Sequence, residues 1–197
     1  MNEHKSIAVV GSRKISAVGA KLAYNAGSII GKNGFNLVNG LALGCDAEAL
    51  KGALAARGKC AVVLPCGINE IYPKSNQWIA EEVLKQGGCL ISEYPEGTRP
   101  EKYRFVQRDR LQSGMSQGVL VVEAMEKSGT MHTAEYAKKQ NRRLACYYHG
   151  LLKYSTGNNV LENLYQAAVI KTNEDLENYL CEIADIEEYT QLSFDFV

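Results

Sequence analysis

The sequence predicts an α/β domain of three layers, in which helices cover both faces of a mostly parallel central sheet. Two observations lead to this fold class. Short apolar runs rich in Val, Ile, Leu and Ala alternate along the chain with longer helical patterns. Each apolar run is followed by a Gly-rich or polar segment and then by the next helix. This alternation is typical of parallel strands joined by right-handed crossovers.

The strands are predicted from runs that are too short for helices and too apolar for exposed loops. Val119–Val122 is the clearest, because it is β-branched, follows Gly118 and has no polar residue on either face. A further short run at 168–170 precedes the last helical segment. The predicted strands are 6–10, 36–39, 60–64, 89–92, 119–122 and 144–148.

The helices are predicted from their ends as well as from their periodicity. Ser16 is a good N-cap for a helix that continues to about Lys32, where Asn33-Gly34 ends it. Gly58 and Gly87-Gly88 end later helices in the same way. The tail at 187–197 is ambiguous. The predicted helices after the first are about 46–57, 76–86, 104–113, 131–140, 160–165 and 174–184.

Length and composition indicate one globular domain over 1–197, with a core at about 6–180 and an acidic C-terminal helix and tail at about 173–197. Hydrophobic residues make up 46% of the chain and charged residues 22%, which is ordinary for such a domain. No apolar run approaches the ~20 residues of a membrane helix. The N-terminus has no signal-peptide pattern. We therefore expect a cytoplasmic protein.

The cysteines and the distribution of charge limit the classes of function that the chain can have. The six cysteines have no metal-ligand spacing and lie in or beside apolar runs, so we expect buried thiols, no metal and no cofactor. The net charge of zero hides an asymmetry: eight acidic residues and no Lys or Arg lie after residue 173, which leaves residues 1–172 with a net charge of +8. A basic body is compatible with nucleic acid; an ordinary solvated surface is the alternative.

Parallel strands place their carboxyl ends at one edge of the sheet, where ligands bind in this class of fold. We therefore expect the polar segments after the strands to form one rim. Gly11, Ser12, Arg13 and Lys14 follow the first strand, and small residues before a helix start let an anion approach backbone N–H groups. Arg13 adds a bidentate donor. A plain tight turn with solvent-facing charges is the alternative. The rim segments are 11–14, 40–46, 65–73, 93–101 and 123–130.

The next two segments of the rim have more architectural patterns. Gly40 and Gly44 flank a strand-to-helix turn that leads to Asp46, and helix capping is the commonest role for Asp at such a place. A ligand contact or an acceptor for loop N–H groups are the alternatives. In the third segment Tyr72 is expected to cover the underside of its loop. Trp78, in the helix that follows, is expected in the core.

The segment 102–110 carries the strongest functional signal. On a helix Phe105 and Arg108 share a face, with Lys102 one turn earlier, and Arg110 follows. Cations beside an exposed aromatic suit single-stranded nucleic acid, because charge binds phosphate and a flat ring stacks on a base. The alternative is a core Phe105 with arginines that are at the surface or paired with carboxylates, of which Asp109 is the obvious one.

The last segment of the rim closes the predicted site. Lys127 precedes Ser128, Gly129 and Thr130, whose hydroxyls and N–H groups suit an oxyanion at a helix start. Thr130 or Thr133 as a simple N-cap is the alternative. Glu123 and Glu135 are the carboxylates that an enzyme would use here.

Several segments together resemble the DprA/Smf family of DNA-processing proteins over about 6–180. They read GSRKIS, NGLALGCDAEALKGAL, LPCGINEIYPKSN, LISEYPEGTRP, FVQRDR, VLVVEAMEKSGTMHTAEYA and, toward the C-terminus, STGNNVLENL. The resemblance implies a Rossmann-like domain that binds single-stranded DNA, catalyses nothing, forms a homodimer and helps to load a RecA-type recombinase in recombination or natural transformation. By position, Arg13 and Lys127 look like phosphate contacts, Lys102 and Phe105 like the family's basic and aromatic pair, and Arg110 like the second Arg of its R-N-R motif.

Departures from the family pattern matter. The R-N-R motif reads Arg108-Asp109-Arg110, and Val106 stands where Pro is usual after the aromatic. We expect no room for the family's flanking helical and winged-helix domains. The alternative function is a LOG-like nucleotide phosphoribohydrolase, or a nucleotide sensor, on the same superfamily fold. The enzyme's P-G-G-x-G-T-x-x-E signature reads 127-KSGTMHTAE-135 here and lacks the double glycine.

Overall fold

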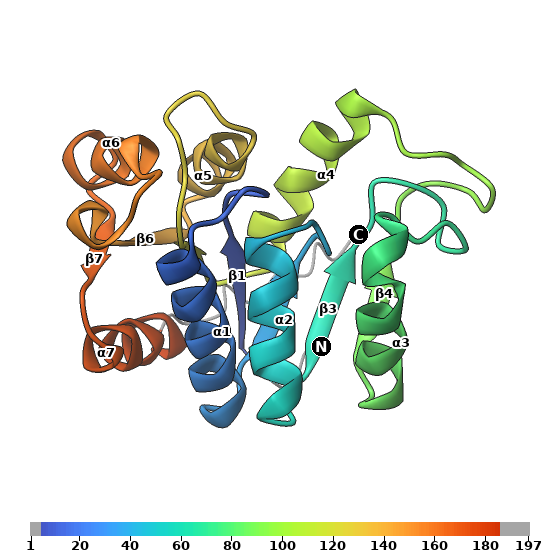
Figure 1. Ribbon diagram of the computed structural model, residues 1–197, viewed down its shortest axis with the longest axis horizontal. Helices are drawn as coiled ribbons and strands as arrows, with labels where there is room; N and C mark the ends of the chain where they lie inside the picture. Colours follow the sequence, from blue (N-terminus) through green and yellow to red (C-terminus); the bar gives the residue numbers. More distant parts are fainter. Residues whose placement is uncertain (1–4, 186–197) are drawn as a thin grey trace, which may run out of the picture.

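The computed structural model describes residues 5–185 and shows one parallel sheet between two layers of helices (Figure 1). The strands lie in the order β4-β3-β2-β1-β5-β6-β7, and every neighbouring pair is parallel. The predicted α/β class is confirmed, and the short run at 168–170 is the seventh strand. The strands are β1 (Ser6–Val10), β2 (Asn36–Asn39), β3 (Cys60–Val63), β4 (Cys89–Ile91), β5 (Gly118–Val121), β6 (Arg143–Tyr147) and β7 (Ala168–Ile170).

The helices begin and end close to the predicted residues. Ser16 caps the first helix as expected, since its Oγ accepts from the Gly19 N–H at 3.0 Å. The helices are α1 (Ala17–Lys32), α2 (Cys45–Ala55), α3 (Gln77–Lys85), α4 (Lys102–Gly114), α5 (Thr130–Lys139), α6 (Thr156–Leu164) and α7 (Asn173–Ala184), with single 3-10 turns η1 (Lys74–Asn76) and η2 (His149–Leu151).

One helix differs from the prediction by a full turn. Helix α6 begins at Thr156 rather than near residue 160, although its first turn contains Gly157 and two Asn residues of low helix propensity. Tertiary hydrogen bonds hold that turn: the Gly157 N–H donates to the Ala124 carbonyl at 2.8 Å, and the Asn158 side chain bonds to the ends of two strands. Single-sequence periodicity cannot detect such a start.

The two helix layers follow from the alternation of apolar side chains along the strands. Ile7 and Val9 of β1 face a core shared by α1, α2, α3 and α7, whereas Ala8 and Val10 face a core shared by α4, α5 and α6. The chain runs outward from β1 to β4, crosses to the other face through α4, and pairs β5 with the free side of β1. The order therefore reverses between β1 and β5, which is where such sheets open a crevice.

Two expectations about individual side chains have clear outcomes. Cys45, Cys60, Cys66 and Cys146 are buried, as predicted, whereas Cys181 is exposed. The prediction of a core Trp78 is wrong: its side chain is 53% exposed, and Lys51 Nζ lies 5.9 Å from its ring centre. A residue in the first turn of a short amphipathic helix does not by itself distinguish the buried face from the exposed one.

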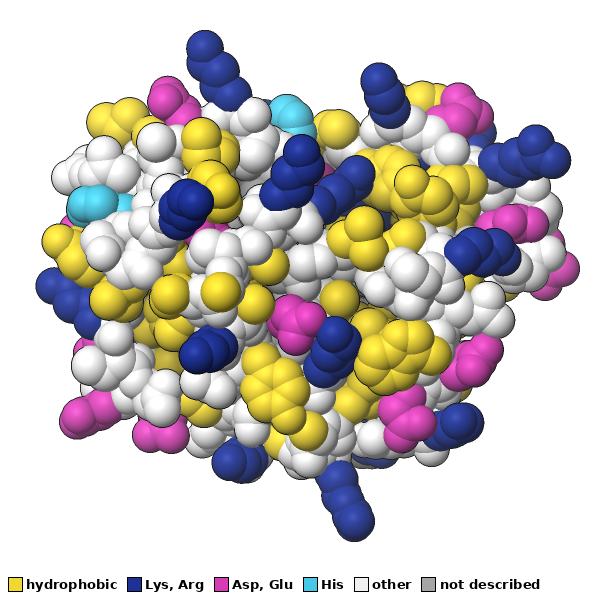
Figure 2. Space-filling model, in the orientation of Figure 1, with side chains coloured by type: hydrophobic (Ala, Val, Ile, Leu, Met, Phe, Trp, Pro, Cys, Tyr) yellow, Lys and Arg dark blue, Asp and Glu magenta, His cyan; other side chains and the backbone are white. Residues whose placement is uncertain are grey.

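None of the helices between residues 5 and 185 combines the length and the apolar content needed to cross a membrane. The ambiguous tail at 187–197 lies outside the described residues. In the face seen in Figure 2, Lys and Arg side chains stand close together near the upper centre, above the carboxyl ends of the strands, and hydrophobic side chains flank them.

Candidate nucleic-acid interface

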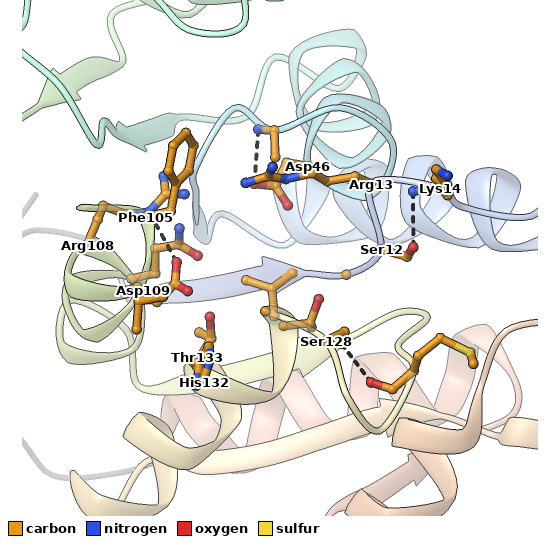
Figure 3. A pocket seen from close by; sticks show the side chains of 18 of the residues that line it. Ser12, Arg13, Lys14, Asp46, Phe105, Arg108, Asp109, Ser128, His132 and Thr133 are labelled. Atoms are coloured by element: carbon orange, nitrogen blue, oxygen red, sulfur yellow. Dashed lines mark hydrogen bonds and ion pairs between the residues drawn. The ribbon is translucent and has the colours of Figure 1, made fainter. Parts of the chain in front are cut away.

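A cleft of about 950 Å³ lies at the carboxyl ends of β1 and β5 (Figure 3). The loops after β1, β2, β3 and β5 contribute to its walls, together with one face of α4 and the first turn of α5. The cleft thus combines segments far apart in the sequence, as predicted from the carboxyl ends of parallel strands meeting at one edge. The predicted site residues in its lining are Gly11, Ser12, Arg13, Lys14, Lys102, Phe105, Arg108, Ser128, Gly129 and Thr130.

The β1–α1 loop is fixed from below and leaves its cations exposed. The Ser12 N–H donates to the Glu123 carbonyl at 2.7 Å, and the Ser12 carbonyl accepts from the Cys45 N–H at 3.1 Å. A Cβ on Gly11 would lie 2.7 Å from Cys45 Sγ, so only glycine allows this close packing. Arg13 and Lys14 extend above this fixed base into the cleft and solvent (Figure 3).

Glu123 supports the same loop rather than serving as a reactive group. Its side chain is fully buried, and its two oxygens accept from the Ser16 N–H at 2.7 Å and from the Tyr154 N–H at 3.0 Å. A Cβ on Gly19 would lie 2.5 Å from Glu123 Oε2, which explains the glycine in the first turn of α1. Glu123 therefore ties the start of α1 to the loop before α6.

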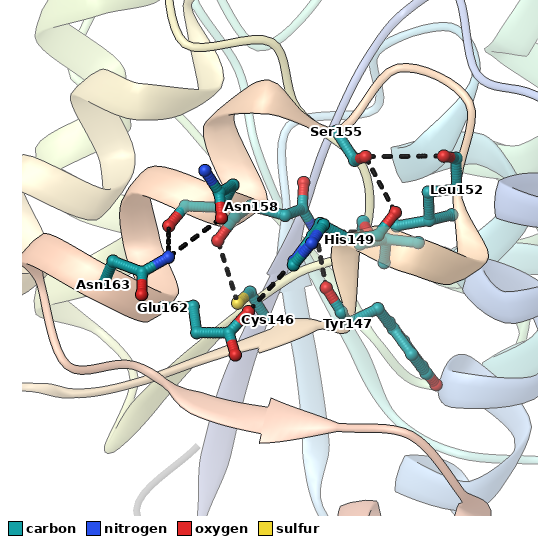
Figure 4. A network of polar contacts seen from close by, with 10 residues as sticks. Cys146, Tyr147, His149, Leu152, Ser155, Asn158, Glu162 and Asn163 are labelled. Atoms are coloured by element: carbon teal, nitrogen blue, oxygen red, sulfur yellow. Dashed lines mark hydrogen bonds and ion pairs between the residues drawn. The ribbon is translucent and has the colours of Figure 1, made fainter.

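A second set of buried contacts shapes the β5–α5 loop (Figure 4). Asn158 Nδ2 donates to the Val122 and Tyr147 carbonyls, both at 2.9 Å, and its Oδ1 accepts from the Ala124 N–H at 2.8 Å. The same side chain thus joins the ends of β5 and β6 and orients the loop that leads to Ser128. The STGNNVLENL segment acts through this scaffold, because Asn158 does not line the cleft.

The β2–α2 loop has an architectural role. The prediction that Asp46 caps α2 is wrong, because the N-cap is Gly44 and Asp46 Oδ2 accepts from the Gly40 N–H at 3.0 Å and the Ala42 N–H at 3.2 Å. Burial raises the pKa of Asp46, and the nearby Arg108 guanidinium opposes the rise. Gly44, at φ +75°, packs against the Ser12 carbonyl, to which a Cβ would come within 2.5 Å.

The absence of a side chain at Gly40 leaves space for the Arg108 guanidinium. A Cβ on Gly40 would lie 2.0 Å from Arg108 Nη1, in space that the guanidinium fills. Arg108 is 4% exposed; its Nη1 donates to the Val63 carbonyl, and its Nε donates to Asp109 Oδ1 at 3.3 Å. In the amide orientation that satisfies both groups, the Gln112 carbonyl oxygen also accepts from Arg108 Nε at 2.9 Å. Arg108 therefore forms the floor of the cleft, with its donors already engaged.

Phe105 lies in the cleft wall and is half-buried, so it is not a core residue. The Arg13 guanidinium lies 4.8 Å from the centre of its ring, and the Tyr72 ring meets it edge-on with centroids 5.7 Å apart. Tyr72 is 43% exposed and lines the cleft instead of covering the underside of its own loop. Arg13 comes from the loop after β1, Tyr72 from the loop after β3 and Phe105 from α4. We call these three side chains the aromatic corner.

Four predicted site residues lie outside the lining: the glycines Gly40 and Gly44, and the cations Arg110 and Lys127. Arg110 Nη2 bonds to both oxygens of Glu93, at 2.6 and 2.7 Å, on another side of α4. Lys127 is exposed beside the cleft, in the loop that leads to Ser128. Within the part of the chain that the structure describes, Arg13, Lys14, Lys102 and Lys127 make no ion pair with a carboxylate. Their charge is therefore available to a ligand.

The start of α5 contributes polar groups to the opposite wall. Its N-cap is Gly129 and has no side-chain cap, so neither Thr130 nor Thr133 caps the helix. The Ser128 hydroxyl donates to the Met125 carbonyl at 2.7 Å, which fixes the turn before the helix (Figure 3). The positive end of the helix dipole is thus directed toward the cleft, where it favours an anion.

Several lining residues were not among the predicted site residues, although Asp109 was predicted as a partner for the arginines of α4 and pairs with Arg108 at 3.3 Å. Asp109 and Gln112 share the helical face of Lys102 and Phe105, so the 3.6-residue period contains the signal for them. His132 and Thr133 lie one turn into α5, and Tyr72 comes from a loop in which sequence alone gives no direction to the ring. Burial raises the pKa of Asp109 to about 6, while Arg108 lowers it.

Comparison with known proteins identifies relatives across this domain. A family model described as DNA recombination-mediator protein A matches residues 1–180. Protein Smf of Escherichia coli is 41% identical over 70% of this chain and 37% of its own length. DNA processing protein DprA of Bacillus subtilis is 35% identical over 73% of this chain and 48% of its own. The chain thus spans between about a third and a half of the length of these curated relatives.

Solved structures give the same result. DNA processing protein A of Helicobacter pylori, described for its single-stranded DNA binding mode, has a TM-score of 0.82 and 30% identity, and covers 90% of this chain and 80% of its own. DprA of Streptococcus pneumoniae has a TM-score of 0.80 and 31% identity, over 89% of this chain and 62% of its own. A molybdenum cofactor binding protein of Rippkaea orientalis, 18% identical at a TM-score of 0.69, shares the fold.

Proposed function

The chain belongs to the DprA/Smf family of DNA-processing proteins, and from this premise we propose that its cleft binds single-stranded DNA without catalysing a reaction on it. The observation that carries the proposal is the aromatic corner, where the exposed Arg13 lies 4.8 Å from the ring centre of Phe105 inside the cleft. An unpaired guanidinium and a ring at one place offer a phosphate contact and a stacking surface together.

The backbone of the DNA would be bound by the rim. Arg13, Lys14 and Lys102 lie in or at the lining and have no carboxylate partner within residues 5–185. The start of α5, with Ser128, Gly129 and Thr130, faces the same space and favours an anion. Lys127 would add charge from just outside. These contacts are independent of sequence and position the strand.

The proposal that the site is not catalytic rests on the state of two carboxylates. An enzyme on this rim would use Glu123 or Glu135 as its acid or base. Both oxygens of Glu123 accept backbone N–H groups, and Glu135 is 48% exposed on α5 outside the cleft lining. Neither carboxylate is placed to activate a water next to a bound nucleotide. The carboxylates that do line the cleft, Asp46 and Asp109, accept hydrogen bonds from loop N–H groups and from Arg108 respectively. The nucleotide hydrolase therefore remains the second hypothesis.

The remaining functional proposals depend on the family rather than on the cleft. We propose that the protein acts in the cytoplasm, pairs with a second copy of itself, and supports a RecA-type recombinase in recombination or DNA uptake. The chain spans only 34% to 48% of the first curated relatives, so these activities of the whole proteins come to it as hypotheses.

Fluorescence anisotropy with labelled oligo-dT, duplex DNA and free nucleotide, measured over a series of salt concentrations, tests the proposal. We expect oligo-dT to bind most tightly, and its affinity to fall steeply with salt as counterions are released. The double variant Arg13→Ala, Lys102→Ala should weaken oligo-dT binding by about tenfold or more and flatten the salt dependence. Arg110→Ala is the matched control, because its cation is already paired with Glu93.

Two results would contradict the proposal. One is oligo-dT binding that is unaffected by the double variant, since the cleft would then not be the site. The other is release of free base from a nucleoside monophosphate in a reaction that Glu135→Gln abolishes, which would establish the enzyme instead.

A further inference from the structure

The wall of the cleft below the aromatic corner is polar and contains an acid, which a phosphate-binding surface does not need. This inner wall consists of Asp109 and Gln112 on α4 and of Thr133 on α5, with His132 beside it. In Figure 3, Asp109, His132 and Thr133 lie below Phe105. The rim cations and the inner wall therefore offer different chemistry to the same strand.

Asp109 is placed to accept hydrogen bonds from a ligand. Its side chain is 13% exposed and lines the cleft, and only Oδ1 has a partner, Arg108 Nε at 3.3 Å. Among residues 5–185, nothing donates a hydrogen bond to its Oδ2. The groups that face it are Arg108 from its own helix, Asp46 from α2 and His132 from α5. Its pKa of about 6 leaves the carboxylate ionised at pH 7.5.

Arg108 does not satisfy that carboxylate fully. Its guanidinium also donates to the Val63 carbonyl and to the Gln112 amide oxygen, so Asp109 shares it with two other acceptors. The Thr133 side chain is 2% exposed and has no hydrogen-bond partner in the described chain, although it borders the cleft. Both groups border the cleft, so a ligand whose polar edge reaches them can make hydrogen bonds with them.

The Watson–Crick edges of the four bases differ in what they offer an ionised carboxylate. Guanine alone presents two adjacent donors, N1–H and the 2-amino group, which match the two oxygens of a carboxylate. Cytosine and adenine present one amino group beside an acceptor. Thymine presents one N–H between two carbonyl oxygens, which repel a carboxylate. The guanine O6 would in turn accept from the Thr133 hydroxyl or the Gln112 amide.

We propose that the inner wall is a base-recognition subsite, in which Asp109 selects guanine in single-stranded DNA while the rim holds the phosphates. The subsite rests on the proposed DNA-binding function and adds specificity to it. A base that stacks at the aromatic corner has its edge beside the inner wall, because Phe105 and Asp109 are four residues apart on one helical face. Bidentate base contacts of this kind discriminate by about 5- to 150-fold.

Anisotropy with three oligonucleotides of about 15 nucleotides tests the subsite at pH 7.5. The first is oligo-dT, the second carries a few isolated dG residues, and the third carries deoxyinosine at the same positions. We expect the dG strand to bind at least about fivefold more tightly than oligo-dT. Deoxyinosine lacks the 2-amino group, so its strand should lie between the two.

Variants separate base reading from general charge. Asp109→Asn removes one negative charge, so it should raise the affinity for oligo-dT and reduce the preference for dG to within about twofold. Glu126→Gln is the matched control: it neutralises an exposed carboxylate in the β5–α5 loop and should leave the dG preference unchanged. Thermal unfolding of both variants verifies that they are folded.

The outcomes distinguish the subsite from the function on which it rests. Equal binding of the dG and dT strands to the unmodified protein overturns the subsite and leaves single-stranded DNA binding intact. A dG preference that survives Asp109→Asn overturns the role of that residue. Binding of free GMP that depends on Asp109, without binding of any oligonucleotide, overturns the DNA-binding function and identifies a nucleotide site.

Discussion

Arg13 and Arg108 border the same cleft but are in opposite physical states. Arg13 is exposed, is stacked over Phe105 and has no carboxylate partner in the described chain. Arg108 is 4% exposed and donates to a backbone carbonyl, a carboxylate and an amide. The first has donors to offer a ligand, whereas the second uses its donors to hold α4 against β3. Arg13 is therefore available to a ligand, whereas Arg108 is architectural.

The difference arises from the backbone around each side chain. Arg13 extends from the β1–α1 loop, whose backbone is anchored at Ser12, and its side chain is exposed. Arg108 extends from α4 over the end of β3, where Gly40 leaves room for the guanidinium and the Val63 carbonyl needs a donor. A charge so deeply buried persists only where such partners are provided.

The largest effect is expected at the buried arginine. Arg108→Ala should lower the free energy of unfolding by about 3–5 kcal/mol, because it leaves the Val63 carbonyl and Asp109 without their donor and opens a void beside Gly40. Urea denaturation followed by circular dichroism measures the loss. Arg13→Ala is the control and should change stability by less than about 1 kcal/mol, since its side chain is exposed. Equal stability losses in the two variants would remove the distinction between them.

The strands, the helices and the α/β class were predictable because their signals are local. Apolar runs, caps such as Ser16 and glycine helix ends lie within a few residues of the elements they define. The start of α6 was not predictable, since its first turn depends on Asn158 and on the ends of two distant strands. The exposure of Trp78 likewise depends on which face of α3 meets the sheet.

The sequence predicted where the site lies but not which contacts each of its residues makes. Strand order brought 11–14, 102–108 and 128–130 to one cleft, as the carboxyl-end rule implies. Sequence could not show that Arg110 reaches Glu93, that Gly40 makes room for Arg108, or that Asp109 keeps an oxygen toward the cleft. Those roles depend on side-chain contacts between segments that are far apart in the chain.

The second-largest effect is expected at Asp109, which lines the cleft beside Arg108. The pKa of Asp109 is about 6 in the folded protein, against an ordinary value of 3.8. The folded state therefore binds the proton more tightly than the unfolded state, and ionisation costs stability as pH rises from about 4 to about 6. Asp109→Asn should thus be more stable than the unmodified protein by up to roughly 3 kcal/mol at pH 7.5 and equal to it below pH 4. Unfolding by urea across this pH range measures the difference, and a difference independent of pH would contradict it.

The smallest effect is expected at Arg110, which sharpens the comparison because it is neither buried like Arg108 nor available like Arg13. Its pair with Glu93 is 44% and 41% exposed, so Arg110→Ala should cost no more than about 1 kcal/mol of stability. The side chain lies outside the cleft lining, so oligo-dT affinity should change by less than about twofold at moderate salt. Glu93→Gln frees the Arg110 cation without removing it. Tighter oligo-dT binding by Glu93→Gln, together with unchanged binding by Arg110→Ala, would show that the pair with Glu93 keeps Arg110 from contacting DNA. Weaker oligo-dT binding by Arg110→Ala would instead show that the interface extends along α4.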